Sequence, residues 1–118
     1  MKATELRIGN LVWNDIQNIP VKVNLKILAE QEIYYENDEK SWKPIPLTEE
    51  WLLKFGFKKE DEYWNYKGFK LWFEKGFYHI NSEYLIHIDY VHQLQNLFFA
   101  LTGESYYAQS ISYSNSAW

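Results

Sequence analysis

The sequence predicts an α+β fold, in which two helices pack on a strongly twisted, mainly antiparallel sheet and the first hairpin can curl into a small partial barrel. Two observations predict this class. Short aromatic and β-branched runs are separated by Gly, Asn and Ser, which is typical of antiparallel strands. Two other segments, at about residues 49–55 and 90–102, carry the capping residues and apolar spacing of helices. With 118 residues, the chain is expected to form a single domain, residues 1–118.

The N-terminal third is predicted to form strands. Residues 8–13 alternate around Gly9, as in a strand with a tight bend. Apolar and polar residues then alternate strictly from 21 to 27, which predicts a half-buried strand with a basic polar face. Residues 30–39 predict a second strand that runs into an acidic loop. The two strands would form a hairpin in which Lys22 and Lys26 face glutamates, each favourable pair contributing about 0.2–1 kcal/mol.

The first helix is expected to begin after Pro44 and Pro46, because each proline ring holds the chain extended. Thr48 is the expected N-cap of a helix over residues 49–55. Gly56 should end this helix, with Phe57 folding back on the last turn in a Schellman ending.

The C-terminal half predicts an antiparallel meander followed by the second helix. After a charged turn at 58–62, strands are expected at 63–67, 69–74, 77–80 and 84–88. Asp89 should cap the helix at 90–102, and Gly103 should end it. Residues 104–118 form a Ser- and Tyr-rich C-terminal extension that could be an edge strand or a mobile tail. The buried stripe of this helix should contain Val91, Leu94, Leu97, Phe98 and Leu101.

Composition predicts a folded, soluble, cytoplasmic protein and argues against several classes. Hydrophobic residues make up 47% of the chain and aromatic residues 19%, opposite to the signature of disorder. A net charge of −4 with Arg7 as the one arginine argues against duplex-DNA binding, and direct nucleic-acid binding is not expected. Without cysteine or a long apolar run, neither disulfides nor membrane spans are expected.

The chain lacks the residue patterns of common catalytic sites. It has no cysteine nucleophile, no G-x-S-x-G motif and no glycine-rich phosphate loop. His79 and His87 could meet Glu83 or Asp89, but the ligand spacings of known metal sites are absent. His92 is expected on a solvated helix face with Gln95, Asn96 and Phe99. We therefore expect a protein that is not an enzyme, with no catalytic residues, no cofactor and no metal site.

Three blocks carry a family resemblance: LRIGNLV near the N-terminus, PIPLTEEWLLKFGFKK at residues 44–59 and YVHQLQNLFFALTGES at residues 90–105. In this order and spacing they resemble a family of small uncharacterised proteins of Bacteroidetes and their phages. The resemblance implies a related fold and phage or mobile-element ancestry. It implies no activity, because that family has no assigned catalytic or binding residues to carry over.

The aromatic excess of six Trp, ten Tyr and seven Phe favours protein binding, although an aromatic core could also explain it. With the net acidity and the resemblance, it predicts a phage- or prophage-derived module that binds a host protein stoichiometrically. The favoured example is an inhibitor of a host defence system, such as an RNA-guided (CRISPR) nuclease or its guide-RNA complex. The expected contact is an acidic, aromatic patch that would steer a basic partner: Glu30, Glu32, Tyr34, Tyr35, Glu36, Asp38, Glu39 and Trp42.

The alternative function is binding of single-stranded nucleic acid on the predicted meander. Aromatic rings beside lysines on a sheet can stack on bases while the ammonium groups contact phosphates. The residues that would do this are Lys70, Trp72, Phe73, Lys75 and Tyr78.

Overall fold

The computed structural model describes residues 1–37, 40–74, 76–80 and 87–103. Its mixed helices and antiparallel strands confirm the α+β class. The five-stranded sheet has the order β3-β4-β5-β6-β7, and β1 and β2 form a separate, open two-stranded sheet instead of a partial barrel. In chain order the elements are η1 (Ala3–Glu5), β1 (Leu11–Asn14), β2 (Ile19–Lys22), α1 (Leu25–Tyr34), α2 (Glu49–Lys54), β3 (Lys58–Lys59), β4 (Tyr63–Tyr66), β5 (Phe69–Glu74), β6 (Phe77–His79), β7 (His87–Ile88) and α3 (Val91–Thr102).

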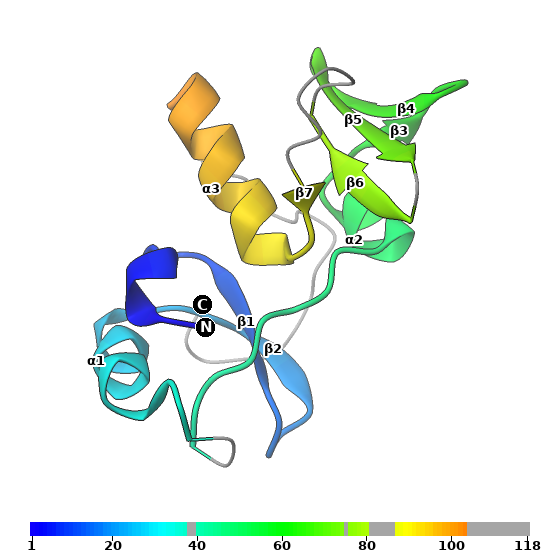
Figure 1. Cartoon of the computed structure of the whole chain (residues 1–118). Helices are drawn as coiled ribbons and strands as arrows, with labels where there is room; N and C mark the ends of the chain where they lie inside the picture. Colours follow the sequence, from blue (N-terminus) through cyan, green and yellow to red (C-terminus); the bar gives the residue numbers. More distant parts are fainter. Residues whose placement is uncertain (38–39, 75, 81–86, 104–118) are drawn as a thin grey trace.

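The elements form two parts, with α3 lying beside both (Figure 1). The N-terminal part contains η1, the β1–β2 hairpin and α1. The second part contains the five-stranded sheet with α2 and α3 packed on one face. The segment between α1 and α2 connects the two parts, and one short stretch of it pairs with β1 through Trp13 and Lys43. This connection shapes the site described below.

The strand prediction holds for Val21 and Lys22, which end β2, but it is wrong from Leu25 to Tyr34, because these residues form helix α1. Residues 38 and 39 lie outside the described part of the chain. Asn24 caps the helix, and its side-chain oxygen accepts a hydrogen bond from the Ile27 N–H at 2.9 Å. The alternation over residues 21–27 therefore crosses from β2 into the first helical turn. Leu25 is 73% exposed whereas Ile27 is buried. The Leu-, Ala-, Gln- and Glu-rich composition of the segment agrees with a helix, since these residues have high helix propensity.

The expected pairing of lysines and glutamates across a hairpin is also wrong. Lys26 pairs with Glu30 one helical turn later, at 3.9 Å. The real first hairpin joins β1 to β2, with Trp13 opposite Pro20, through a turn at residues 15–18. Asn14 holds this turn, because its side-chain oxygen accepts from two backbone N–H groups, those of Ile16 at 2.9 Å and Gln17 at 3.0 Å.

Helix α2 begins and ends as predicted. The Thr48 side chain accepts from the Trp51 N–H, and Gly56 takes φ +94° just after the last turn. The Phe57 N–H donates to the Leu52 carbonyl at 2.9 Å, as in a Schellman ending. The sequence signals for this helix lie within a few residues of its ends, which is why the sequence alone predicts where it begins and ends.

The meander is confirmed within the described residues, with one addition. The predicted turn at 58–62 contains a short strand, β3, whose Lys58 and Lys59 pair with β4. Residues 84–86 of the last predicted strand lie outside the described part of the chain, and β7 covers His87 and Ile88. Trp64 lies opposite Leu71 in the register, so both side chains project from the same face toward the helices.

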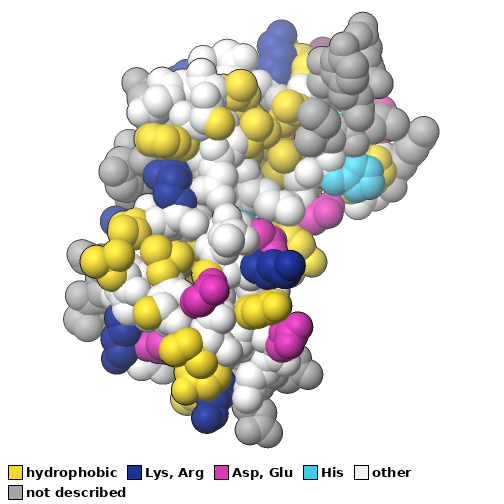
Figure 2. All heavy atoms as spheres, turned by 60° about the vertical axis from the view of Figure 1, so that its left-hand side comes forward, with side chains coloured by type: hydrophobic (Ala, Val, Ile, Leu, Met, Phe, Trp, Pro, Cys, Tyr) yellow, Lys and Arg dark blue, Asp and Glu magenta, His cyan; other side chains and the backbone are white. Residues whose placement is uncertain are grey.

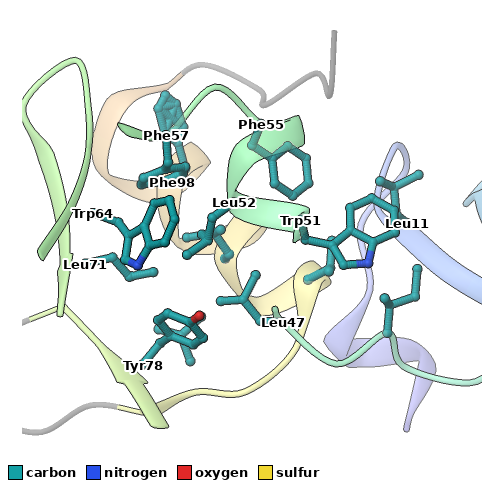
Figure 3. Packing of buried hydrophobic residues seen from close by; sticks show 14 residues of the cluster. Leu11, Leu47, Trp51, Leu52, Phe55, Phe57, Trp64, Leu71, Tyr78 and Phe98 are labelled. Atoms are coloured by element: carbon teal, nitrogen blue, oxygen red, sulfur yellow. The ribbon is translucent and has the colours of Figure 1, made fainter. Parts of the chain in front are cut away.

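The main core lies between this sheet face and the two helices (Figure 3). Trp64, Leu71 and Tyr78 project from β4, β5 and β6 toward Leu52 of α2 and Phe98 of α3. A smaller cluster of buried residues fills the space between the first hairpin and α1, namely Val12, Val21, Val23 and Ile27.

Helix α3 begins one residue later than expected. Tyr90, rather than Asp89, is the N-cap, and the Gln93 side chain accepts from the backbone N–H groups of both, at 3.0 and 2.8 Å. Gly103 ends the helix with φ +73°. Leu101 is 61% exposed, so its assignment to the buried stripe is wrong. The C-terminal extension, residues 104–118, lies outside the described residues.

His92 and Gln95 on the polar face of α3 are buried, which corrects the prediction that they are solvated, whereas Asn96 is half-buried and Phe99 is 40% exposed. His92 is 1% exposed and Gln95 is 3% exposed, because this face packs on the N-terminal part. Gln95 Oε1 accepts from the Leu11 N–H at 2.8 Å, and Asn96 Oδ1 accepts from Asn10 Nδ2 at 2.9 Å. Gln95 and Asn96 therefore provide hydrogen-bond partners for polar groups at the start of β1, and they connect the two parts of the fold.

Candidate functional site

The structure brings together part of the predicted acidic, aromatic patch. Glu30, Tyr34 and Trp42 line one cavity. Glu32 and Glu36 are exposed, Tyr35 is half-buried, and none of these three lines that cavity. Asp38 and Glu39 lie outside the described residues.

The first cavity has a volume of about 360 Å³ and lies where three segments meet. The β1–β2 turn forms one wall, the C-terminal half of α1 a second, and the segment after α1 a third. Its rim includes Ile16, which is 88% exposed at the tip of the hairpin. The cavity is lined by Trp13, Asn14, Asp15, Ile16, Glu30, Tyr34, Lys40, Ser41 and Trp42.

Gln31 holds the third wall of this cavity in place. Its side chain is fully buried, and Oε1 accepts from the Trp42 N–H at 2.7 Å. Gln31 Nε2 donates to the carbonyl oxygens of both Trp42 and Met1. One amide side chain thus attaches the segment after α1 to the helix and positions the Trp42 ring at the cavity.

A second cavity of about 490 Å³ adjoins the first, since Trp13 and Asp15 line both. Trp13 is held between them by two backbone hydrogen bonds with Lys43, of 2.8 and 3.2 Å. We call the two cavities together the Trp13 groove. The second cavity is lined by Trp13, Asp15, Lys43, Pro44, Ile45, Pro46, Thr48, Glu50 and Trp51.

Charge in the Trp13 groove is mixed, and carboxylates outnumber ammonium groups among the lining residues by three (Asp15, Glu30 and Glu50) to two (Lys40 and Lys43). Outside the lining, Lys54 pairs with Glu50 at 3.3 Å and Lys26 with Glu30 at 3.9 Å. Among the described residues, no cation lies within ion-pairing distance of Asp15. The groove therefore combines aromatic walls with carboxylates, which favours a cationic or amphipathic ligand over an anionic one.

The residues of the predicted nucleic-acid surface are only partly together. Lys70 and Trp72 share the sheet face that points away from the helices, whereas Phe73 points to the other side of β5 because side chains alternate along a strand. Tyr78 is 6% exposed and belongs to the core, so it cannot stack on a base. Lys75 lies outside the described residues.

The two sheet histidines are register partners. His79 lies directly opposite His87, and the Phe77 ring stacks on His87 with centroids 3.6 Å apart. His79 Nε2 lies 3.7 Å from Glu74 Oε2. Glu83 lies outside the described residues. The part of the chain that is described contains no group of three or more His, Cys, Asp or Glu residues able to hold a metal ion.

His92 is buried between α3 and η1. Its Nε2 lies 3.8 Å from Glu5 Oε1, and its ring stacks on Tyr90 with an interplanar angle of 10°. Burial lowers the pKa of His92, and the nearby Glu5 carboxylate opposes this shift. No cavity described here includes His92, so we assign it a role in packing.

Sequence reasoning missed most residues of the Trp13 groove. Trp13 and Asp15 lie in a hairpin that was not predicted, although Asn14 and Asn18 are common turn residues and were a usable signal. Gln31 had no such signal, because its role depends on partners that are 11 and 30 positions away in the chain.

Comparisons with known proteins add no family to this description. No family model, curated protein or solved structure matches the chain. Within the described residues, no helix has both the length and the apolar character needed to cross a membrane.

Proposed function

We propose that this chain is a non-catalytic protein-binding module that acts stoichiometrically and uses the Trp13 groove as its contact site. The observation that carries this proposal is the pair of adjoining cavities that share Trp13 and Asp15, with an exposed Ile16 on the rim. An extended segment of a partner could place one side chain in each cavity. Aromatic anchors around a groove are the usual source of binding energy at protein interfaces.

The partner class that the charges favour is a host protein with a basic surface. The chain carries a net charge of −4, and the groove has an excess of carboxylates. Opposite fields steer association and raise its rate. With the resemblance of three sequence blocks to a family of Bacteroidetes and phage proteins, these charges favour a cytoplasmic defence protein as the target, for example an RNA-guided nuclease whose nucleic-acid channel is basic.

The test is recovery of a complex from the lysate of a host bacterium. Wild-type protein should retain one host protein at a constant molar ratio, measured by light scattering of the purified complex. Ile16→Lys should reduce recovery at least ten-fold, because it places a cation on the rim of the groove. Leu53→Lys is the matched control, since Leu53 is 60% exposed on α2 and does not line either cavity. Absence of a stoichiometric partner would refute the proposal.

Single-strand nucleic-acid binding is a second candidate, favoured by one observation. The Tyr63 and Trp72 rings lie 5.6 Å apart on the outer sheet face, and the Lys70 ammonium lies 4.9 Å from the Tyr63 ring. The chain carries a net charge of −4, however, which opposes binding to a phosphate backbone. On the side of the molecule that Figure 2 shows, Lys and Arg side chains also lie among hydrophobic and acidic ones rather than in a continuous stripe. We therefore expect no mobility shift of single-stranded RNA or DNA with micromolar protein at about 50 mM salt.

A further inference from the structure

We propose that the first cavity of the Trp13 groove binds a cationic side chain of the partner, a lysine or an arginine, at the place that Lys40 occupies in the free chain. This inference rests on the proposed function and names the group that is recognised. It is argued from the aromatic walls, the carboxylates beside them and the position of Lys40.

The walls of the cavity suit a cation. Trp13, Tyr34 and Trp42 reach it from three different segments. The face of an aromatic ring is electron-rich, and several rings around one space attract ammonium and guanidinium groups more strongly than neutral groups of the same shape. Gln31 holds the Trp42 backbone, so this wall is in place before a ligand arrives.

The carboxylates add charge complementarity. Asp15 lines the cavity and has no ion-pair partner among the described residues. Glu30 also lines it, and its pairing with Lys26 is long, at 3.9 Å, with the Lys26 side chain 84% exposed. A cation that takes the place of Lys40 would therefore meet two carboxylates, of which only Glu30 has another ion pair among the described residues, the long one with Lys26.

Lys40 indicates where the cation lies. Its ammonium nitrogen is 5.0 Å from the centroid of the Tyr34 ring, within the range of a cation–π contact. The Lys40 backbone N–H is held separately, by the Asn37 side-chain oxygen at 3.0 Å. The exposed Lys40 side chain can therefore leave the ring without a change in the backbone. In the free chain it acts as an internal ligand that a partner's cation must displace.

The test uses the isolated chain and small probes, with the indole N–H signals of Trp13 and Trp42 followed by NMR. Choline is compared with its neutral isostere, the alcohol that carries a tert-butyl group in place of trimethylammonium. We expect choline to shift both signals saturably, and the isostere to bind at least ten-fold more weakly. Blocked lysine and blocked arginine derivatives then show which of the two side chains fits the cavity better.

Replacement of Lys40, the internal ligand, tests the inference more specifically than the wild-type titration does. Lys40→Gln should bind choline about two- to five-fold more tightly than wild type, because the competing cation is gone. Lys43→Gln is the matched control. Lys43 lines the second cavity and its ammonium donates to Ser41 Oγ beside the first, so this change removes the same charge without freeing the Tyr34 ring and should change affinity less. Equal binding of choline and its isostere, or an effect of Lys40→Gln no larger than that of Lys43→Gln, would overturn the inference.

The result of this experiment can be distinguished from that of the lysate experiment that tests the proposed function. If the isolated chain binds choline with the expected selectivity but no host partner is recovered, the inference stands and the proposed function fails. If a partner is recovered through Ile16 but the cavity shows no preference for cations, the function stands and this inference fails.

Discussion

At the scale of single residues, buried polar side chains hold the two parts of this fold together and position a segment of the candidate site. Gln31 fixes the Trp42 backbone, and Gln95 satisfies the Leu11 N–H from 84 positions away. A buried polar group that loses its hydrogen-bond partner destabilises the folded state by about 1–3 kcal/mol, so each of these two amides makes a sizeable contribution to stability. Their partners are distant in sequence, which is why sequence patterns could not identify them.

His92 gives a pH-dependent prediction. Its pKa is lowered by burial, so the native state holds the neutral imidazole while the unfolded chain binds a proton near pH 6.5. This contribution to stability is complete above that pH and decreases as the pH falls from about 6.5 toward the lower native pKa. The loss in unfolding free energy between pH 7 and pH 5, measured by urea denaturation, should therefore be smaller in His92→Gln than in wild type.

The control for this prediction is Ala100→Gln, at an exposed position on α3, which changes no titratable group. This variant should keep the pH dependence of the wild type. An equal loss of stability in wild type and His92→Gln would show that His92 does not titrate as described.

At the scale of secondary-structure elements, local sequence signals predict some elements correctly and assign others to the wrong type. For α2, the cap at Thr48 and the stop at Gly56 both act within a few residues of the helix, so the sequence located it. For α1, the alternation of apolar residues indicates a strand, whereas Asn24, a common helix-capping residue, marks where the helix begins. Periodicity alone fails here because the pattern spans two elements of different type, with the boundary between Val23 and Leu25.

The cap of α1 can be tested by Asn24→Ala. The Asn24 side chain accepts from the Ile27 N–H, so its loss should destabilise the protein by about 1 kcal/mol in urea denaturation. Asn24→Asp should keep most of this stability, because an aspartate oxygen can accept the same hydrogen bond. Equal stability of the alanine variant and the wild type would contradict the helix boundary.

The end of α2 gives a matched pair of glycine substitutions. Gly56 and Gly68 have similar positive φ angles, +94° and +89°, so Ala causes similar backbone strain at both. A Cβ at Gly56 would also lie 3.1 Å from Tyr66 Cε1, whereas one at Gly68 meets nothing within 4 Å. Gly56→Ala should therefore lower the thermal midpoint more than Gly68→Ala. A larger decrease for Gly68→Ala would contradict the packing of α2 on β4.

At the scale of the whole molecule, the fold class could be predicted but the arrangement of its two parts could not. The aromatic meander and both of the expected helices depend on nearby residues, and all are present in the structure. The Trp13 groove forms only because α1, the first hairpin and the segment leading to α2 meet in space. Of the six predicted patch residues that the structure describes, three line its first cavity, namely Glu30, Tyr34 and Trp42.

The central claim, that the groove contacts a protein partner, is tested most directly by site-specific photo-crosslinking in a host lysate. A photoreactive phenylalanine analogue is placed at Ile16, on the rim, or at Phe73, which is 50% exposed on the sheet. Both positions are exposed and apolar, so they differ mainly in location. We predict one discrete protein adduct from position 16 and none from position 73. An adduct from position 73 alone, or adducts to nucleic acid at either position, would contradict the assignment of the groove.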